Sequence, residues 1–172
     1  WKPKLVVADE ADSILVEQFR ALAATLHQPQ VAHGMKVVLL TSAEPGEGKS
    51  LTAVNLALTL SGSYGRRVLL MDADLRRPSL NRIAQLPGDR GLGEALKAVE
   101  PQKVPLYHVS EPLVMARAVR PDANPMSVVT SPRMQELISH ARARFDWVLI
   151  DAPPLGPIAD ATLLAPLAEA VL

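Results

Sequence analysis

The chain has 172 residues, enough for one domain with a substantial core, and 18 Lys and Arg residues balance 18 Asp and Glu residues. This balance gives no net field that would attract nucleic acid or an acidic membrane surface. With two each of Trp, Tyr and Phe there is also no stacking platform for single strands, so we expect no nucleic-acid partner. The absence of cysteine excludes disulfides and thiolate metal sites and fits the cytosol, and no apolar run is as long as a membrane span.

The first predicted element is an amphipathic helix over residues 10–28. Its apolar stripe consists of Leu15, Phe19, Leu22 and Leu26. On another face, Glu17 and Arg20 lie three residues apart. Taken alone, this spacing predicts a solvated ion pair worth only a few tenths of a kcal/mol. We expect the helix to end at Gln28-Pro29 and a loop to follow.

A phosphate-binding loop is predicted next, between a strand and a helix. The short apolar run Val37–Leu40 reads as a buried strand, and the stretch from Ser50 to Leu60, free of Gly and Pro, reads as a helix. Between them lies the Gly-rich segment Thr41–Ser50, whose backbone N–H groups and helix N-terminus would hold an anion. A surface turn that happens to contain Gly-Lys-Ser is the alternative, and the flanking strand and helix argue against it.

The residues of this loop predict how a nucleoside triphosphate would be held. Glycines let the backbone approach the phosphate oxygens, Lys49 would reach the β- and γ-phosphates, and the Ser50 hydroxyl would ligate Mg²⁺. One departure from the general pattern is Ala43, which stands where a glycine is usual. The expected nucleotide-binding residues are Pro45, Gly46, Glu47, Gly48, Lys49, Ser50 and Leu51.

A second strand, Val68–Met71, leads into two aspartates. Asp72 and Asp74 follow this apolar run directly, and alternate residues of an extended segment point to the same side. Two ordinary surface aspartates are the alternative. Because ligands of open α/β sheets lie at the carboxyl ends of the strands, we expect both carboxylates to face the phosphates.

The pattern is weaker between Pro78 and Pro132, where prolines are frequent. A short helix is predicted from Gly91 to Val99, and short strands from Leu106 to Val109 and from Leu113 to Ala116. A further helix begins with Ser131 as N-cap and Pro132 at its first position. Its expected buried stripe is Met134, Leu137, Ile138 and Ala141.

The third strong strand, Trp147–Ile150, ends in Asp151, as in a Walker B motif. Asp160 lies near the start of the following helix, where a capping role is expected. Three strands are therefore followed by candidate functional residues, and we expect the three carboxylates to converge beside the phosphates. The apolar residues 170–172 predict the start of another strand. Because the chain opens at Trp1 rather than Met, we expect a fragment.

The sequence gives no support for a histidine metal site, a serine nucleophile or a dinucleotide-binding fingerprint. The four histidines, His27, His33, His108 and His140, show no metal-ligand spacing. No serine occupies a nucleophile elbow, and no G-x-G-x-x-G segment follows a strand. The residues by themselves thus predict a single α/β domain with a mostly parallel sheet, helices on both faces, and bound Mg·ATP.

At this point the sequence resembles the bacterial tyrosine kinases of capsular and exopolysaccharide synthesis. Residues 45–50 resemble that family's Walker A motif, residues 68–78 its Walker A′ motif and residues 145–154 its Walker B motif. Asn124-Pro125 followed by residues 130–134 is similar to its Asn-Pro…Ser-x-x-Met stretch. The Ala43 departure is tolerated in this family. The resemblance covers nearly the whole chain.

The resemblance implies a P-loop NTPase-like three-layer α/β/α fold over residues 1–172 and ATP-dependent tyrosine kinase activity with ATP and Mg²⁺ as cofactors. Catalysis would fall to Lys49, Asp72 and Asp151, with Asp72 as the acceptor of the tyrosine proton. Ser50, Asp72, Asp74 and Asp151 would form the metal site. Implied partners are a tyrosine-containing protein, including a second copy phosphorylated in trans, and a membrane-anchored activator or polysaccharide co-polymerase. The implied location is cytoplasmic, at the inner face of the plasma membrane.

Two departures from this family affect assembly. Its oligomerisation motif, Glu-x-x-Arg-x-x-Arg, is met by Glu17 and Arg20 in the 10–28 helix, but Ala23 stands at the last position. We therefore expect a homo-oligomer weakened by Ala23. The family also carries a C-terminal tyrosine cluster, whereas this chain has only Tyr64 and Tyr107.

Two other functions stay open. One is a dimeric switch ATPase of the partitioning or division-site type. Those proteins resemble one another in an early P-loop lysine, where this chain has Glu44. The other is a catalytically silent partner that binds ATP only to hold a conformation. The intact residues Lys49, Ser50, Asp72 and Asp151 argue against it.

Overall fold

The computed structural model describes residues 5–6, 13–84, 88–156 and 159–172. Its strands form one sheet in the order β3-β4-β2-β5-β1-β6. The central strands are β2 (Val68–Asp72), β5 (Trp147–Asp151) and β1 (Val37–Leu40), with β4 (Leu113–Ala116) and β6 (Ala170–Val171) beside them. These five run parallel, and β3 (Tyr107–Ser110) is antiparallel to β4. The predicted mostly parallel sheet is thus confirmed.

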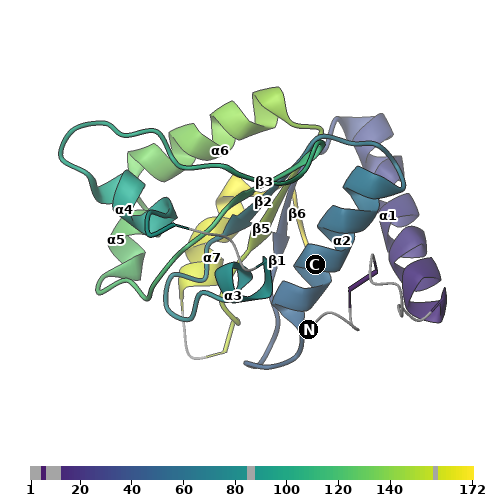
Figure 1. Ribbon diagram of the computed structural model, residues 1–172, viewed down its shortest axis with the longest axis horizontal. Coiled ribbons are helices and arrows are strands. Elements are labelled where there is room, and N and C mark those ends of the chain that lie inside the picture. Colours follow the sequence, from purple (N-terminus) through teal and green to yellow (C-terminus); the bar gives the residue numbers. More distant parts are fainter. Residues whose placement is uncertain (1–4, 7–12, 85–87, 157–158) are drawn as a thin grey trace.

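Helices cover both faces of the sheet (Figure 1). One face carries α1 (Ser13–His33), α2 (Lys49–Gly62) and α3 (Leu80–Ala84). The other carries α4 (Leu92–Lys97), α5 (Pro125–Val129), α6 (Pro132–Arg144) and α7 (Asp160–Leu164), after which a 3₁₀ turn spans Ala165–Leu167. The arrangement is the expected three-layer α/β/α fold.

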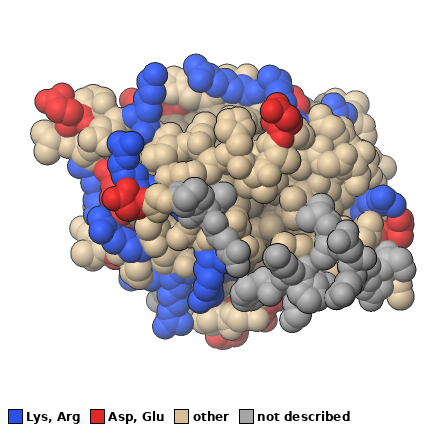
Figure 2. All heavy atoms as spheres, viewed as in Figure 1, with Lys and Arg blue, Asp and Glu red and all other residues tan. Residues whose placement is uncertain are grey.

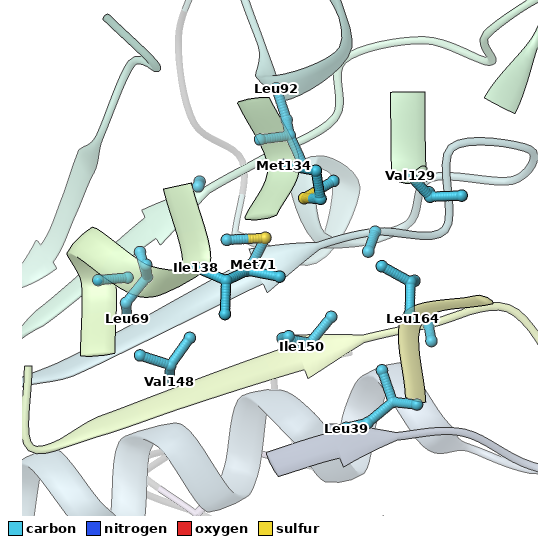
Figure 3. Close-up of a cluster of buried hydrophobic side chains, with 14 of the residues drawn as sticks. Leu39, Leu69, Met71, Leu92, Val129, Met134, Ile138, Val148, Ile150 and Leu164 are labelled. Atoms are coloured by element: carbon cyan, nitrogen blue, oxygen red, sulfur yellow. The ribbon is translucent and has the colours of Figure 1, made fainter. Parts of the chain in front are cut away.

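Alternation along the strands divides the core into two layers. Successive side chains along each strand point to opposite faces of the sheet. Leu39 of β1 and Ile150 of β5 therefore belong to one layer, and Val38 and Leu149 belong to the other. Figure 3 shows the first layer, in which strand side chains meet residues from the helices that cover them. The labelled residues there are Leu39, Leu69, Met71, Leu92, Val129, Met134, Ile138, Val148, Ile150 and Leu164. Because the central strands are buried on both faces, they read as unbroken apolar runs in the sequence.

Several predicted elements lie where the sequence placed them, including β3 and β4 in the weakly patterned region. Ser131 caps α6 by accepting a hydrogen bond from the N–H of Met134. In the predicted stripe of α6, Leu137 is only partly buried. Helices α3 and α5 were not predicted. The sequence feature that could have predicted α5 is Asn124 before Pro125. The Asn124 side chain caps this helix by accepting a hydrogen bond from the N–H of Ser127.

The predicted end of the first helix was wrong. The α-helix α1 continues through Pro29 to His33, where Gly34, at φ 67°, donates its N–H to the carbonyl of Gln30 and closes the last turn. The side chain of Gln30 also donates to the carbonyl of Asp146, 2.9 Å away and just before β5. Tertiary contact therefore outweighs the loss of one helical hydrogen bond at proline. The first predicted residues, 10–12, lie outside the described residues.

The position of Ala23 differs from the one implied by the oligomerisation motif. Ala23 is 1% exposed and packs with Leu26 against α2, whereas Glu17 and Arg20 form an exposed ion pair of 2.6 Å. The two motif positions present in this chain therefore face solvent, and the third faces the core. An arginine at position 23 would have to displace that packing.

On the face shown in Figure 2, acidic side chains stand among the basic ones. Surface ion pairs of the described residues include Arg142–Glu169 at 2.8 Å and Arg120–Glu94 at 3.0 Å. Exposed pairs of this kind contribute little to stability. No helix within the described ranges has the length and apolarity needed to span a bilayer.

Candidate functional site

The carboxyl ends of three neighbouring strands bring the predicted site residues together. In the sheet, Asp151 at the end of β5 lies opposite Leu40 of β1 on one side and opposite Asp72 of β2 on the other. The N–H of Ala73 also donates to the carbonyl of Asp151 at 2.9 Å. Strand order therefore places the loop that follows β1 and both aspartate segments at one edge.

The phosphate-binding loop leads directly into α2. Gly46 and Gly48 have φ values of 91° and 94°, in the left-handed region that L side chains rarely adopt. A Cβ atom at either glycine would meet nothing within 4 Å, so backbone conformation rather than crowding requires glycine there. No side chain caps α2 at Gly48, and α2 begins at Lys49. The first N–H groups of a 14-residue helix therefore face the loop, where they suit an anion.

The segment after β5 braces the loop from the side. The Thr41 hydroxyl donates to the carbonyl of Pro153 at 2.7 Å, and the N–H of Leu155 donates to the carbonyl of Ser42 at 2.8 Å. Gly156 approaches so closely that a Cβ there would lie 3.1 Å from the carbonyl oxygen of Ala43. Sequence reasoning did not identify this support, because its partners are separated by more than a hundred residues.

Lys49 lies at the centre of the site. Its Nζ is 3.0 Å from Asp74 Oδ2, 3.3 Å from Asp151 Oδ1 and 3.2 Å from the Ser50 hydroxyl. The Lys49 side chain is only 11% exposed. Burial alone would lower the pKa of Lys49, but the carboxylates of Asp151 and Asp74 outweigh burial and raise that pKa. The ammonium group is thus held charged between two acids.

Asp72 and Asp151 are both fully buried. Burial raises the pKa of Asp72 well above its usual value, and the neighbouring Asp151 carboxylate raises it further. Burial also raises the pKa of Asp151, although Lys49 and a hydrogen bond from Ser50 oppose that rise. Asp72 and Asp151 are partners in the register of adjacent strands, so the Asp151 carboxylate is close enough to disfavour the ionised form of Asp72.

Each of these aspartates keeps one oxygen without a hydrogen-bond partner among the described residues. Asp72 Oδ2 accepts the N–H groups of Ser79 and Leu80, at 3.2 and 3.1 Å, but Asp72 Oδ1 and Asp151 Oδ2 have no such partner. Orphaned buried oxygens are costly unless another group binds them. They fit Mg²⁺, which usually takes one or two carboxylates together with substrate phosphates.

Protein side chains alone do not make a complete metal cage here. Within the described ranges, no three or more His, Cys, Asp or Glu residues are grouped so that they would hold an ion by themselves. A bound Mg²⁺ would therefore need the Ser50 hydroxyl and phosphate oxygens as further ligands. Asp74 is the least available of the predicted ligands, because one oxygen pairs with Lys49 and the other accepts the N–H of Arg77 at 3.0 Å.

Asp160 does not have the capping role expected for it. The N-cap of α7 is Ala159, and Asp160 in the first helical turn forms two hydrogen bonds with Arg76, at 2.7 and 3.1 Å. Arg76 belongs to the segment after β2, so this ion pair joins the two aspartate-bearing segments. The sequence contained the arginine but no signal for its partner, which lies 84 residues later.

Known proteins are similar to this chain over nearly its whole length. The ParA family model, described as NUBPL iron-transfer P-loop NTPase, matches residues 34–165. Tyrosine-protein kinase YwqD of Bacillus subtilis is 36% identical over 167 residues, which cover 96% of this chain and 70% of YwqD. The succinoglycan biosynthesis transport protein ExoP of Rhizobium meliloti is 34% identical over 173 residues, which cover 97% of this chain but only 22% of ExoP.

A solved kinase domain also has a very similar fold. The kinase domain of Escherichia coli tyrosine kinase ETK matches this structure with a TM-score of 0.89 at 27% sequence identity. That match covers 98% of this chain and 66% of the ETK chain. The similarity to known kinase domains therefore includes the loop, both aspartate segments and the helices around them.

Proposed function

Since this chain belongs to the ParA-type P-loop NTPases and, among them, to the bacterial tyrosine kinases, we propose that it transfers the γ-phosphoryl group of ATP to the hydroxyl of a protein tyrosine. The observation that carries the proposal is the position of Lys49 between Asp74 and Asp151, at the start of a helix whose N-terminus no side chain caps. Phosphoryl transfer needs mainly positioning and neutralisation of charge, and this arrangement supplies both.

The P-loop residues have distinct tasks in this proposal. Residues 46–51, which follow Pro45, present backbone N–H groups to the phosphates, and Lys49 exchanges a carboxylate partner for phosphate oxygens. Ser50, Asp72 and Asp151 are the residues that would hold Mg²⁺, and Asp74 keeps Lys49 oriented from the side. When bound, the ion neutralises charge on the β- and γ-phosphates.

Asp72 is the residue we assign to the tyrosine proton. Its Oδ2 is fixed by two N–H groups, so Oδ1, which has two lone pairs, would have to serve both Mg²⁺ and the tyrosine proton. Burial raises the pKa of Asp72, and a base works best when its pKa lies closer to the working pH. The tyrosine oxygen forms the new bond to the γ-phosphorus, the bond to the β-phosphate oxygen breaks, ADP leaves, and the proton passes to Asp72.

The acceptor is not a tyrosine that lies in this site. The Tyr64 hydroxyl donates to the carbonyl of Arg20 on α1, and the Tyr107 hydroxyl donates to the carbonyl of Arg90. The acceptor would therefore come from another protein or from a second copy acting in trans. Exposure of Glu17 and Arg20 on α1 supports a role of that helix in assembly.

The names of the relatives extend the proposal to polysaccharide synthesis and export, since ExoP is a succinoglycan biosynthesis transport protein. We propose that the chain works on the cytoplasmic side of the plasma membrane, with a membrane-anchored activator or polysaccharide co-polymerase as partner. Co-purification with such a membrane protein, lost in an Arg20→Ala variant, would support this placement.

A transfer assay tests the kinase proposal. The chain is incubated with Mg·ATP labelled at the γ-position and a tyrosine-containing polymer, and label on phosphotyrosine is measured. We expect label with the wild type and none with Lys49→Met. Hydrolysis of ATP without any transfer to tyrosine would favour the switch ATPase instead, a possibility raised by the ParA family model although Glu44 stands at the lysine position of that group. Binding without turnover would indicate a silent partner.

A further inference from the structure

The ion pair between Arg76 and Asp160 lies at the same sheet edge as the site. Its geometry is bidentate, with Arg76 Nε 2.7 Å from Asp160 Oδ2 and a terminal nitrogen 3.1 Å from Asp160 Oδ1. The Asp160 side chain is 2% exposed, whereas that of Arg76 is 38% exposed. Such a planar fork fixes direction as well as distance.

The arginine is two residues away from Asp74 and belongs to the same turn. Asp74 Oδ1 accepts the N–H of Arg77, so Arg76 is enclosed by the turn that this bond closes. The bond with Asp160 raises the pKa of Arg76, and the Asp74 carboxylate adds to that rise. Both carboxylates therefore act on one guanidinium, but only Asp160 holds it directly.

Asp74 is also a partner of Lys49, at 3.0 Å. A guanidinium released from Asp160 would have the Asp74 carboxylate beside it in the same turn and would compete with Lys49 for it. Resting on the proposed function, we infer that Asp160 is a positioning residue that anchors Arg76 away from Asp74, so that Asp74 stays available to orient the phosphate-binding Lys49.

This role predicts that Arg76→Gln lowers stability more than Asp160→Asn does, whereas Asp160→Asn lowers activity more than Arg76→Gln does. Arg76→Gln leaves a buried carboxylate without its cation, which is strongly destabilising, but it also removes the competitor for Asp74. Asp160→Asn leaves a half-exposed guanidinium, which is milder for stability, but it frees Arg76 to capture Asp74. The double variant removes the competitor again and should recover activity relative to Asp160→Asn.

The experiment measures urea unfolding, Mg·ATP affinity and ATP turnover for the wild type, both single variants and the double variant. We expect Arg76→Gln to lower the urea midpoint more than Asp160→Asn does. We expect Asp160→Asn to lower kcat about tenfold, Arg76→Gln at most about threefold, and the double variant to match Arg76→Gln.

A matched control lies at the opposite edge of the same two strands. Arg67 precedes β2 and Asp146 precedes β5, and they form a similar two-point contact at 3.0 and 3.4 Å. Arg67→Gln and Asp146→Asn should lower the midpoint while leaving kcat within about twofold of the wild type. Such a result would separate a general effect of losing an ion pair from the effect on Lys49.

The outcomes discriminate between the two levels of the proposal. A wild type that does not bind Mg·ATP would overturn the proposed function and this inference together. If the wild type turns over ATP, two results would overturn the inference alone. In the first, Asp160→Asn keeps wild-type kcat. In the second, the double variant is as inactive as Asp160→Asn. The first case would mean that the ion pair serves stability only, and the second that Asp160 affects turnover by a route other than restraining Arg76.

Discussion

The substitution Lys49→Met should destabilise the folded chain even without nucleotide. Lys49 Nζ compensates two carboxylates at 3.0 and 3.3 Å, and the side chains of Asp74 and Asp151 are 6% and 0% exposed. Removing one partner of a buried ion pair costs about 3–5 kcal/mol. Because Asp151 can take up a proton to relieve part of this cost, we expect a loss near the lower limit, about 3 kcal/mol at pH 8.

The loss should shrink as the pH falls. Folding raises the pKa of both Asp72 and Asp151 above the unfolded value of 3.8, so protonation of these groups favours the folded state. Their contribution to stability is complete below the unfolded pKa and is lost as the pH rises through the folded pKa. The Lys49 ammonium stays charged throughout this range, since its own pKa is raised from 10.5. The difference between variant and wild type should therefore narrow from about pH 8 toward about pH 5.

Urea titration followed by tryptophan fluorescence gives the measurement, because Trp147 in β5 is buried in the core. With a slope of roughly 2 kcal/mol per molar urea, a loss of 3 kcal/mol moves the midpoint by about 1.5 M. Arg120→Met is the control, since Arg120 is 72% exposed and pairs at 3.0 Å with Glu94, whose side chain is 30% exposed. It should cost at most about 1 kcal/mol. Equal losses for the two variants, or a difference that does not change with pH, would refute the reasoning.

The remaining predictions concern the carboxylates, the loop and the first helix. Asp72→Asn and Asp151→Asn should each abolish transfer to tyrosine while weakening Mg·ATP binding much less, and calorimetric titration alongside the transfer assay would show whether binding and turnover fall together instead. Gly48→Ala should cost about 1–2 kcal/mol, because a Cβ disfavours the φ of 94°, and should weaken Mg·ATP binding; an unchanged urea midpoint would contradict this. Arg20→Ala should shift any oligomer toward monomer in sedimentation without changing ATP affinity. Ala23→Arg should destabilise the chain by about 3 kcal/mol or more rather than promote rings, and a folded, ring-forming variant would show that position 23 opens outward.

Much of the fold was predictable because its signals are local. The runs Val37–Leu40, Val68–Met71 and Trp147–Ile150 are apolar throughout, which is what strands buried on both faces require. The left-handed turns at Gly46 and Gly48 need residues without a Cβ, so their pattern is visible in the sequence. The aspartates at the ends of β2 and β5 were expected at the carboxyl edge of the sheet, because ligands of open α/β sheets lie there.

The rest depends on contacts between segments far apart in the chain. Strand order puts Asp151 opposite Asp72, leaves one oxygen of each without a partner among the described residues, and places Lys49 between Asp74 and Asp151. No periodicity within one segment encodes that order, because strand pairing is a contact between segments that lie far apart in the chain.

Tertiary contact also overrode three local expectations. Packing and the Gln30 contact carry α1 past Pro29, burial against α2 turns Ala23 away from solvent, and Arg76 takes Asp160 as an ion-pair partner rather than leaving it as a cap. In each case the sequence determined which element formed. The end of α1, the buried side of Ala23 and the partner of Arg76 were decided by contacts with other segments. Burial and ion pairing act between segments that only the tertiary structure places together.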